Sequence, residues 1–456
     1  MAHATPLVGE TAVELADLVR AGAVAPVEIV DAHLDQIARY DSRVGAFQIV
    51  RVDAARAEAE ALAARVDLAE LPLAGVPVAI KDTIAVEGEP TRVGSLATSD
   101  APATADSELV RRLRAAGAIV LGKTKVPELC AWAWTDSAFG ITRNPWSLDR
   151  TPGGSSGGSA AAIAAAMVPI AHGSDGGGSI RTPAAACGLV GIKPGQGVVP
   201  GAPGRSGWKG LSSDGPLAST VDDLALALSV LADRPALADA TVPGRALRVA
   251  VSVRSPLGAD EIDPSFADAT RSTGELLARA GHAVTAADPP YGFDMLLGMG
   301  TRAFAGMAAD ASEMPRSRLE RRSRTIVLLG AAVQRLGLVR DTDRDRWRAR
   351  AREFFEDFDV LVTPTLSAPP VPAEGWSRRS WLANTRAATF APFTGPWNLA
   401  GYPAAAVPAG MHPDGVPLSV QVVAPEGGES LVLSVAKQLE ALRPWPRHAP
   451  LVASGA

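Results

Sequence analysis

The sequence of 456 residues is poor in several features that define common classes of protein. Its two cysteines, Cys130 and Cys187, exclude a disulfide framework and are typical of a reducing compartment. The longest apolar run, residues 160–171, contains Pro169 and falls short of the roughly 20 residues that a membrane-spanning helix needs. Residues 1–13 lack the basic and apolar regions of a secretory signal. These absences predict a soluble, cytoplasmic protein with no membrane segment.

The charge balance and the ligand-forming residues exclude further classes. Lysine and arginine number 44 against 49 acidic residues, a formal charge of −5, so the chain has no overall basic field to attract nucleic acid. No cluster of cysteine and histidine has the spacing of metal ligands, and we expect neither a metal nor an organic cofactor. An apolar fraction of 47% is sufficient for a large core and excludes a disordered chain.

Strand-like and helix-like segments alternate along the chain, which predicts an α/β fold with a mixed, largely buried sheet. Residues 1–66 form a predicted helical layer, whose amphipathic helices could form a homodimer face, and residues 71–235 form the predicted core. Residues 289–356 read as helices without strands, either a cap or insertion over a site or simply peripheral helices. Because no linker divides the sequence, we expect one domain over residues 1–456.

Two loops rich in glycine and serine, at residues 151–159 and 173–179, flank a helix of small residues. They lack the Gly-Lys-Ser/Thr ending of a Walker A loop and the pattern of a dinucleotide-binding loop. Consecutive glycines instead allow backbone N–H groups to converge on one point, as an oxyanion hole requires, beside a hydroxyl nucleophile. The candidates are Gly176, Gly177, Gly178 and Ser179.

A nucleophilic serine needs a base, and lysine is the stronger candidate here. His172 is more typical of a packed structural side chain, and the sequence has no Gly-x-Ser-x-Gly motif. Only six of the 44 basic residues are lysines, and Lys81 directly follows the apolar run 76–80. Desolvation lowers the pKa of a lysine and leaves an amine that can accept a proton. The alternative is a strand-end lysine paired with Asp82, and the sequence leaves both interpretations open.

The motifs around these residues resemble the amidase signature family. The resemblance rests on Gly75-Val-Pro-Val-Ala-Ile-Lys81-Asp82, Gly153-Gly-Ser155-Ser156-Gly-Gly-Ser159 and Gly177-Gly-Ser179-Ile-Arg181, in that order and spacing. Further motifs extend it over nearly the whole chain. It implies the amidase-signature fold, a central twisted mixed β-sheet covered by α-helices on both faces.

The resemblance also implies a mechanism, hydrolysis of a small carboxylic acid amide through an acyl-enzyme. Carried over by motif position, Ser179 is the nucleophile, Ser155 the bridging serine on a cis peptide after Gly154, and Lys81 the terminal base. Ser156 is expected to orient the lysine. Asp175 and Arg181 are expected to brace the loop rather than to react. In one departure, Gly176 stands where the family usually has a larger residue.

The substrate is less well defined by the sequence. In the family, the residues between 125 and 140 run beside the active site. We therefore hypothesise that this stretch helps to line an acyl pocket. The candidate pocket residues are Leu129, Cys130, Trp132, Trp134 and Trp397. The alternative is that Trp132 and Trp134 pack in the core. A rival function is the A subunit of a tRNA-dependent amidotransferase, which releases ammonia from glutamine for partner subunits. The 393–398 stretch and the chain length look more like stand-alone amidases.

Overall fold

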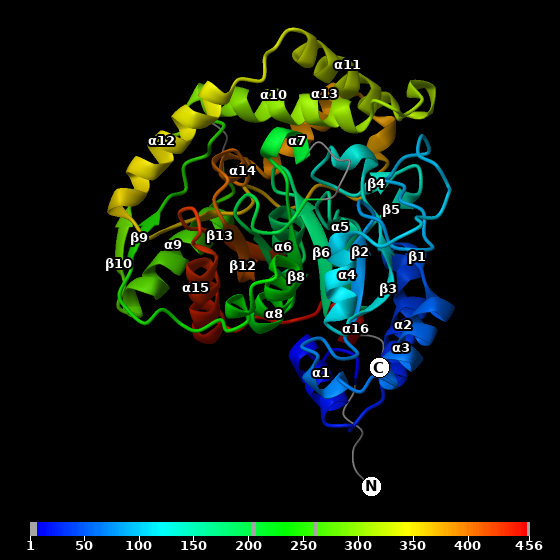
Figure 1. Cartoon of the computed structure of the whole chain (residues 1–456). Helices are drawn as coiled ribbons and strands as arrows, with labels where there is room; N and C mark the ends of the chain where they lie inside the picture. Colours follow the sequence, from blue (N-terminus) through cyan, green and yellow to red (C-terminus); the bar gives the residue numbers. More distant parts are fainter. Residues whose placement is uncertain (1–6, 202–206, 259–261, 454–456) are drawn as a thin grey trace.

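A single eleven-stranded sheet runs through the molecule, with helices on both of its faces (Figure 1). The computed structural model describes residues 7–201, 207–258 and 262–453. Across the sheet, the strands follow the order β1 (Phe47–Val50), β3 (Ile119–Thr124), β2 (Pro77–Lys81), β6 (Ile170–Asp175), β8 (Ser213–Ala218), β7 (Val190–Lys193), β12 (Ala404–Met411), β13 (Pro417–Val423), β11 (Val360–Pro364), β9 (Arg248–Val251) and β10 (Ala283–Ala286). Parallel and antiparallel pairs both occur, which confirms the predicted mixed α/β fold.

The N-terminal helices begin where the sequence predicts. Thr11 caps the first of them in a capping box with Glu14, and Pro26 opens the second at its first position. The N-terminal and core helices are α1 (Ala12–Arg20), α2 (Pro26–Val44), α3 (Val52–Ala63), α4 (Glu108–Ala115), α5 (Gly157–Ala164), α6 (Arg181–Ala186), α7 (Gly207–Gly210), α8 (Val221–Ala232), α9 (Pro264–Arg279), α13 (Trp381–Ala387), α14 (Gly395–Ala400), α15 (Glu429–Leu442) and α16 (Pro450–Ala453). A two-stranded ribbon, β4 (Asp136–Ser137) and β5 (Gly140–Ile141), lies apart from the main sheet.

Two central strands bring the candidate residues to one edge of the sheet. All residues of β2 are buried, as expected for a strand covered on both faces. Strand β2 is parallel to β6, with Val78 opposite Ile170, so both strands end at the same edge. Lys81 is the last residue of β2, and Ser174 and Asp175 end β6. The apolar run from residue 71 is a strand only from Pro77 onward.

The segment predicted to be purely helical contains α10 (Phe293–Asp310), α11 (Arg321–Arg335) and α12 (Asp341–Asp357), and between residues 293 and 357, all of them described, no strand occurs. Helices α10 and α11 lie across the upper end of the molecule, above α7 (Figure 1). Arg302 of α10 donates a hydrogen bond to the Lys209 carbonyl in α7 at 2.9 Å. This segment therefore covers the edge of the sheet at which Lys81 lies.

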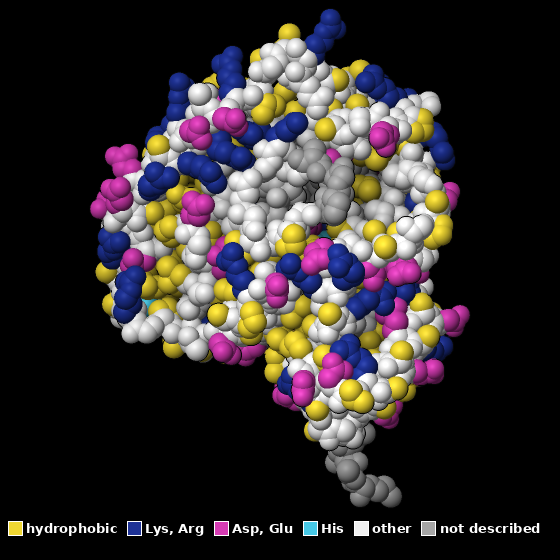
Figure 2. Space-filling model, in the orientation of Figure 1, with side chains coloured by type: hydrophobic (Ala, Val, Ile, Leu, Met, Phe, Trp, Pro, Cys, Tyr) yellow, Lys and Arg dark blue, Asp and Glu magenta, His cyan; other side chains and the backbone are white. Residues whose placement is uncertain are grey.

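The surface carries charged side chains of both signs (Figure 2), as the near-equal numbers of basic and acidic residues predict. Basic and acidic side chains lie interspersed over the face shown in Figure 2, with many basic ones over the upper helices. Among the described residues, no helix is long and apolar enough to cross a membrane. One continuous sheet takes strands from both halves of the chain. A single domain over residues 1–456 stays a prediction.

Candidate active site

Lys81 lies completely buried between two serines at the edge of the sheet. Its Nζ is 2.8 Å from Oγ of Ser155 and 2.9 Å from Oγ of Ser174, and it donates to the Ser174 carbonyl at 3.0 Å. The carboxylate of Asp82, the partner that the sequence left open for Lys81, forms a buried ion pair with Lys123 at 2.8 Å. The amine of Lys81 is therefore placed against hydroxyl groups.

Ser155 is held at the start of α5 by a tightly packed turn. The peptide between Gly154 and Ser155 is cis, the arrangement that the resemblance implies. A Cβ atom at Gly154 would lie 2.6 Å from the backbone N and O of Trp134, so only glycine fits there. Helix α5 begins at Gly157, inside the loop that the sequence predicted to extend to residue 159. The start of this helix directs the buried Ser155 hydroxyl toward Lys81.

Ser179 lies in the turn between β6 and α6 and is partly exposed. Its carbonyl accepts a hydrogen bond from the Ser156 amide at 3.1 Å, which ties the two glycine-rich loops together. The hydroxyl of Ser156 accepts a weaker hydrogen bond from the Ser174 amide at 3.3 Å. Ser156 thus contacts Ser174, the residue whose hydroxyl and carbonyl contact Lys81. Its role in orienting the lysine stays a prediction.

A buried ion pair braces the Ser179 turn from below. Both carboxylate oxygens of Asp175 lie 2.9 Å from the guanidinium of Arg181, and neither side chain is exposed. Arg181 also donates to Gln421 and Asn398, each at 2.6 Å. Burial by itself raises the pKa of Asp175, but the charge and hydrogen bonds of Arg181 outweigh it and hold that pKa well below its usual range. This carboxylate is fully charged and serves as a scaffold.

Charge also accumulates around Lys193, at the end of β7. Burial, and then the charge of Arg181, lower the pKa of Lys193 to about 7. Its Nζ donates to the Pro194 carbonyl at 2.9 Å. The lysine thus lies beside the charged pair of Asp175 and Arg181.

One peptide of the glycine run is fixed from both sides. The Gly178 amide donates to Asp175 at 2.6 Å, and the Thr394 hydroxyl donates to the Gly177 carbonyl at 2.7 Å. Gly178 has a φ of 132°, and a Cβ there would lie 2.2 Å from Oγ1 of Thr394. Within the described part of the chain, the amides of Gly176, Gly177 and Ser179 donate to no protein group. These three amides are thus the ones available to a ligand.

Ser179 opens into a cavity of about 190 Å³. Two of the five predicted pocket residues, Cys130 and Trp132, line it together with Trp208. The other lining residues are Ala131, Ala133, Gly154, Gly177, Gly178, Thr182, Ala388 and Ala391. The described lining therefore combines aromatic and small side chains with exposed backbone and has no charged side chain.

The other three predicted pocket residues lie in the core. Trp134 stacks behind Trp132 with ring centres 5.4 Å apart, and Trp397 packs against the ring of Trp347. Leu129 is 1% exposed and belongs to a small apolar cluster with Val327. Trp134 thus has the core position that the sequence left open as the alternative, and Leu129 and Trp397 also lie in apolar clusters.

Sequence reasoning missed two residues that contact the site. Ser174 touches Lys81 twice, and Thr394 fixes the Gly177 peptide. A strand prediction extended by three residues, from His172 to Asp175, would have placed Ser174 beside Lys81 on the neighbouring parallel strand. No local signal marks Thr394, because it arrives from more than 200 residues away.

The chain is similar to known amidases over nearly its whole length. The amidase family matches residues 28–433 of the chain. A putative amidase of Mycobacterium tuberculosis, AmiB2, is 43% identical over 450 residues, covering 94% of this chain and 96% of that protein. The chain therefore belongs to the amidase family and is an enzyme of that family.

Solved structures show the same fold. That of 6-aminohexanoate cyclic dimer hydrolase has a TM-score of 0.90 at 31% identity, covering 99% of this chain and 100% of its own. A bacterial aryl acylamidase has a TM-score of 0.88 at 26% identity, with the same coverage. The A subunit of glutamyl-tRNA(Gln) amidotransferase from Thermotoga maritima is more distant, with a TM-score of 0.75 at 27% identity and 98% coverage of both chains.

Proposed function

We propose that the protein hydrolyses small carboxylic acid amides through an acyl-enzyme on Ser179, with Ser155 and Lys81 as a proton relay. The observation that carries this proposal is the 2.8 Å contact between Lys81 Nζ and Ser155 Oγ, buried beside the serine that opens into the cavity. A carboxylate–histidine pair is not needed, because the amine itself serves as the base.

The contacts of Lys81 suit a neutral amine. Nζ lies within hydrogen-bond distance of the Ser155 hydroxyl and of the hydroxyl and carbonyl of Ser174. In the neutral form that we propose, two N–H groups donate to Ser174 and the lone pair takes the proton of Ser155. Complete burial disfavours the charged ammonium form. As Ser155 gives its proton to Lys81, its oxygen accepts the proton of Ser179, so the nucleophile is activated through one intermediate hydroxyl.

The oxygen of Ser179 then attacks the amide carbonyl carbon, and the negative charge develops on the carbonyl oxygen. The amides of Gly176, Gly177 and Ser179 are the proposed oxyanion donors, whereas the Gly178 amide is committed to Asp175. The relay runs in reverse to protonate the leaving nitrogen, the carbon–nitrogen bond breaks, and the amine departs. Water then attacks the ester by the same relay and releases the carboxylic acid.

The lining of the cavity favours an apolar or aromatic substrate. Its apolar members include Trp132, which is 6% exposed, and several alanines. Glutamine, the substrate of the rival amidotransferase function, carries a carboxylate, and the described lining offers no cationic side chain to bind it. We therefore favour a stand-alone amidase. Cytoplasmic location and a homodimer stay predictions.

Trp132→Ala is expected to change the order of substrate preference. Loss of an aromatic wall should lower kcat/KM for aryl amides by about tenfold or more relative to acetamides, since one apolar contact contributes roughly 1–3 kcal/mol. The measurement is the ratio of kcat/KM between benzamide-type and short aliphatic amides. Trp134→Phe, which changes the ring behind Trp132, is the control and should preserve the ratio. An unchanged ratio in Trp132→Ala would contradict the pocket.

Ser174→Ala tests the support of the proposed base. Removing one hydrogen-bond acceptor from Lys81 should lower kcat by roughly 10- to 100-fold, the usual effect for a bond to a charged or chargeable group. The acid limb of the pH profile of kcat/KM should also move to lower pH, because the lost bond favours the protonated amine more than the neutral one. A lower kcat with an unshifted pH profile would show that Ser174 acts only on structure.

A further inference from the structure

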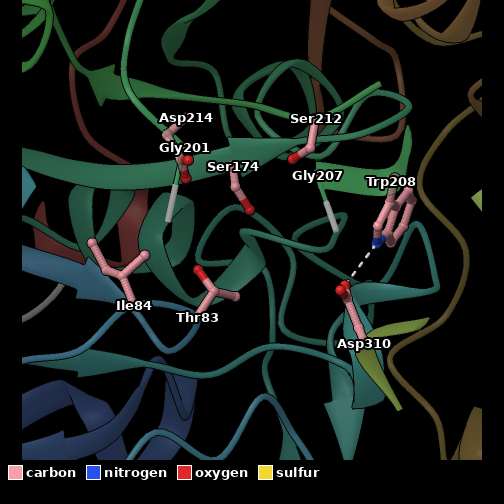
Figure 3. Close-up of a pocket in the computed structure, with 9 residues that line it drawn as sticks. All are labelled: Thr83, Ile84, Ser174, Gly201, Gly207, Trp208, Ser212, Asp214 and Asp310. Carbon is pink, nitrogen blue, oxygen red and sulfur yellow. Dashed lines mark hydrogen bonds between the residues drawn. The ribbon is translucent and has the colours of Figure 1, made fainter. Parts of the chain in front are cut away.

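Trp208 separates two cavities. It lines the cavity of Ser179 and also a second one of about 70 Å³, whose other lining residues include Ser174, Thr83 and Asp214. Figure 3 shows the Trp208 ring on one side of the residues that line this second cavity, with Ser174 and Thr83 across from it. Because Ser174 contacts Lys81, the second cavity begins beside the proton relay.

Two glycines leave the space that the indole ring occupies. A Cβ at Gly176, in the loop before Ser179, would lie 2.6 Å from Cε3 of Trp208. A Cβ at Gly306, on α10, would lie 2.4 Å from its Cα. Real side chains do not approach this closely, so both positions must remain glycine for the ring to sit where it does. The indole ring of Trp208 thus occupies the space that a side chain larger than glycine at position 176 would need.

The ring is also held in orientation. Its Nε1 donates to Asp310 on α10 at 3.2 Å (Figure 3). Trp208 and Lys209 both have left-handed backbone angles, with φ of 49° and 54°. Successive left-handed residues other than glycine are rare and persist where the surroundings fix them. The covering helix α10 thus holds the turn and its side chain against the active-site loop.

We propose that Trp208 closes the far end of the substrate site and limits the length of the amide that the enzyme accepts. This inference rests on the proposed function and adds the residue that sets its size selectivity. Trp208 lines both cavities, so loss of the indole is expected to join them, and a longer chain on the amide can then extend from the Ser179 cavity into the one beside Ser174. With the indole in place, chains that reach the ring are rejected by contact.

The test measures kcat/KM over two substrate series, anilides of straight-chain acids from two to ten carbons and acetamides of amines of increasing length. In Trp208→Ala, the ratio of the longest to the shortest member should rise by roughly tenfold or more in one series relative to the unaltered protein. Trp208→Phe keeps a ring in place and should retain the original ratio. Ratios within twofold of the original in both series would overturn the proposal.

A pair of glycine variants provides a second test that does not depend on the stability of Trp208→Ala. Gly176→Ala places a methyl group against the indole and should alter the length profile, whereas Gly300→Ala, on α10, meets nothing within 4 Å, lines neither cavity and should leave the length profile unchanged. Equal profiles in the two variants would contradict the role of Trp208. Hydrolysis of the shortest amide by the unaltered protein, and its loss in Ser179→Ala, report separately on the proposed function.

Discussion

Ser179→Ala is expected to abolish amide hydrolysis, lowering kcat by at least about 10³-fold, as removal of a nucleophile does in other serine hydrolases. The substitution deletes only the attacking oxygen. The scaffold around Asp175 and Arg181 uses other atoms, and the amide and carbonyl of residue 179 remain. Binding of substrate should therefore persist. The measurement is kcat for a short amide together with the affinity of the variant for that amide.

The control for this change is Ser159→Ala, in the helix that follows Ser155. Ser159 donates to the His172 carbonyl at 2.9 Å and contacts Thr124, so its loss disturbs packing without touching the relay. We expect at most a severalfold effect on kcat in this variant. Retention of more than a tenth of the original rate in Ser179→Ala would disprove the proposed nucleophile.

Lys81→Met and Lys81→Arg are expected to produce the second large loss, also at least about 10³-fold in kcat for amides. Methionine has no proton acceptor, and arginine stays protonated at any accessible pH, so neither can take the proton of Ser155. The loss should be smaller for an ester with the same acyl group and a good leaving group. Such a group departs without a proton, whereas an amide nitrogen must receive one.

The measurement is the ratio of ester to amide kcat/KM, which should rise in both Lys81 variants. Matched substrates keep the acyl contacts constant, so the ratio reports on the relay alone. If arginine restored amide hydrolysis to within tenfold of the original, Lys81 would act as a charge and not as a base.

The residues of the proposed relay could be named from the sequence because they lie in local motifs, and their catalytic roles stay predictions. Lys81 ends an apolar strand, and Ser155 and Ser179 stand in loops whose composition is readable without a structure. The sheet class also followed from alternation along the chain. Contacts that join distant segments were not readable, as with Thr394, because one sequence gives no measure of which loops meet.

The substrate pocket shows the same limit. Apolar residues at positions 129–134 could face either a cavity or the core, since both environments select the same side chains. The structure separates them: Cys130 and Trp132 line the cavity, whereas Trp134 is 1% exposed and packs on Trp376. The glycine run 176–178 could likewise be predicted only in part. Composition indicated amides near Ser179, but the use of the Gly178 amide by Asp175 depends on side-chain geometry.

The most direct test of the account is mass spectrometry of the acyl-enzyme. The protein is mixed with an anilide or activated ester, quenched in acid within one turnover, digested and mapped. We predict the mass of the acyl group on the peptide that contains Ser179, and no added mass in Ser179→Ala. An acyl group found on Ser155 or on Cys130 instead of Ser179 would contradict the proposed mechanism.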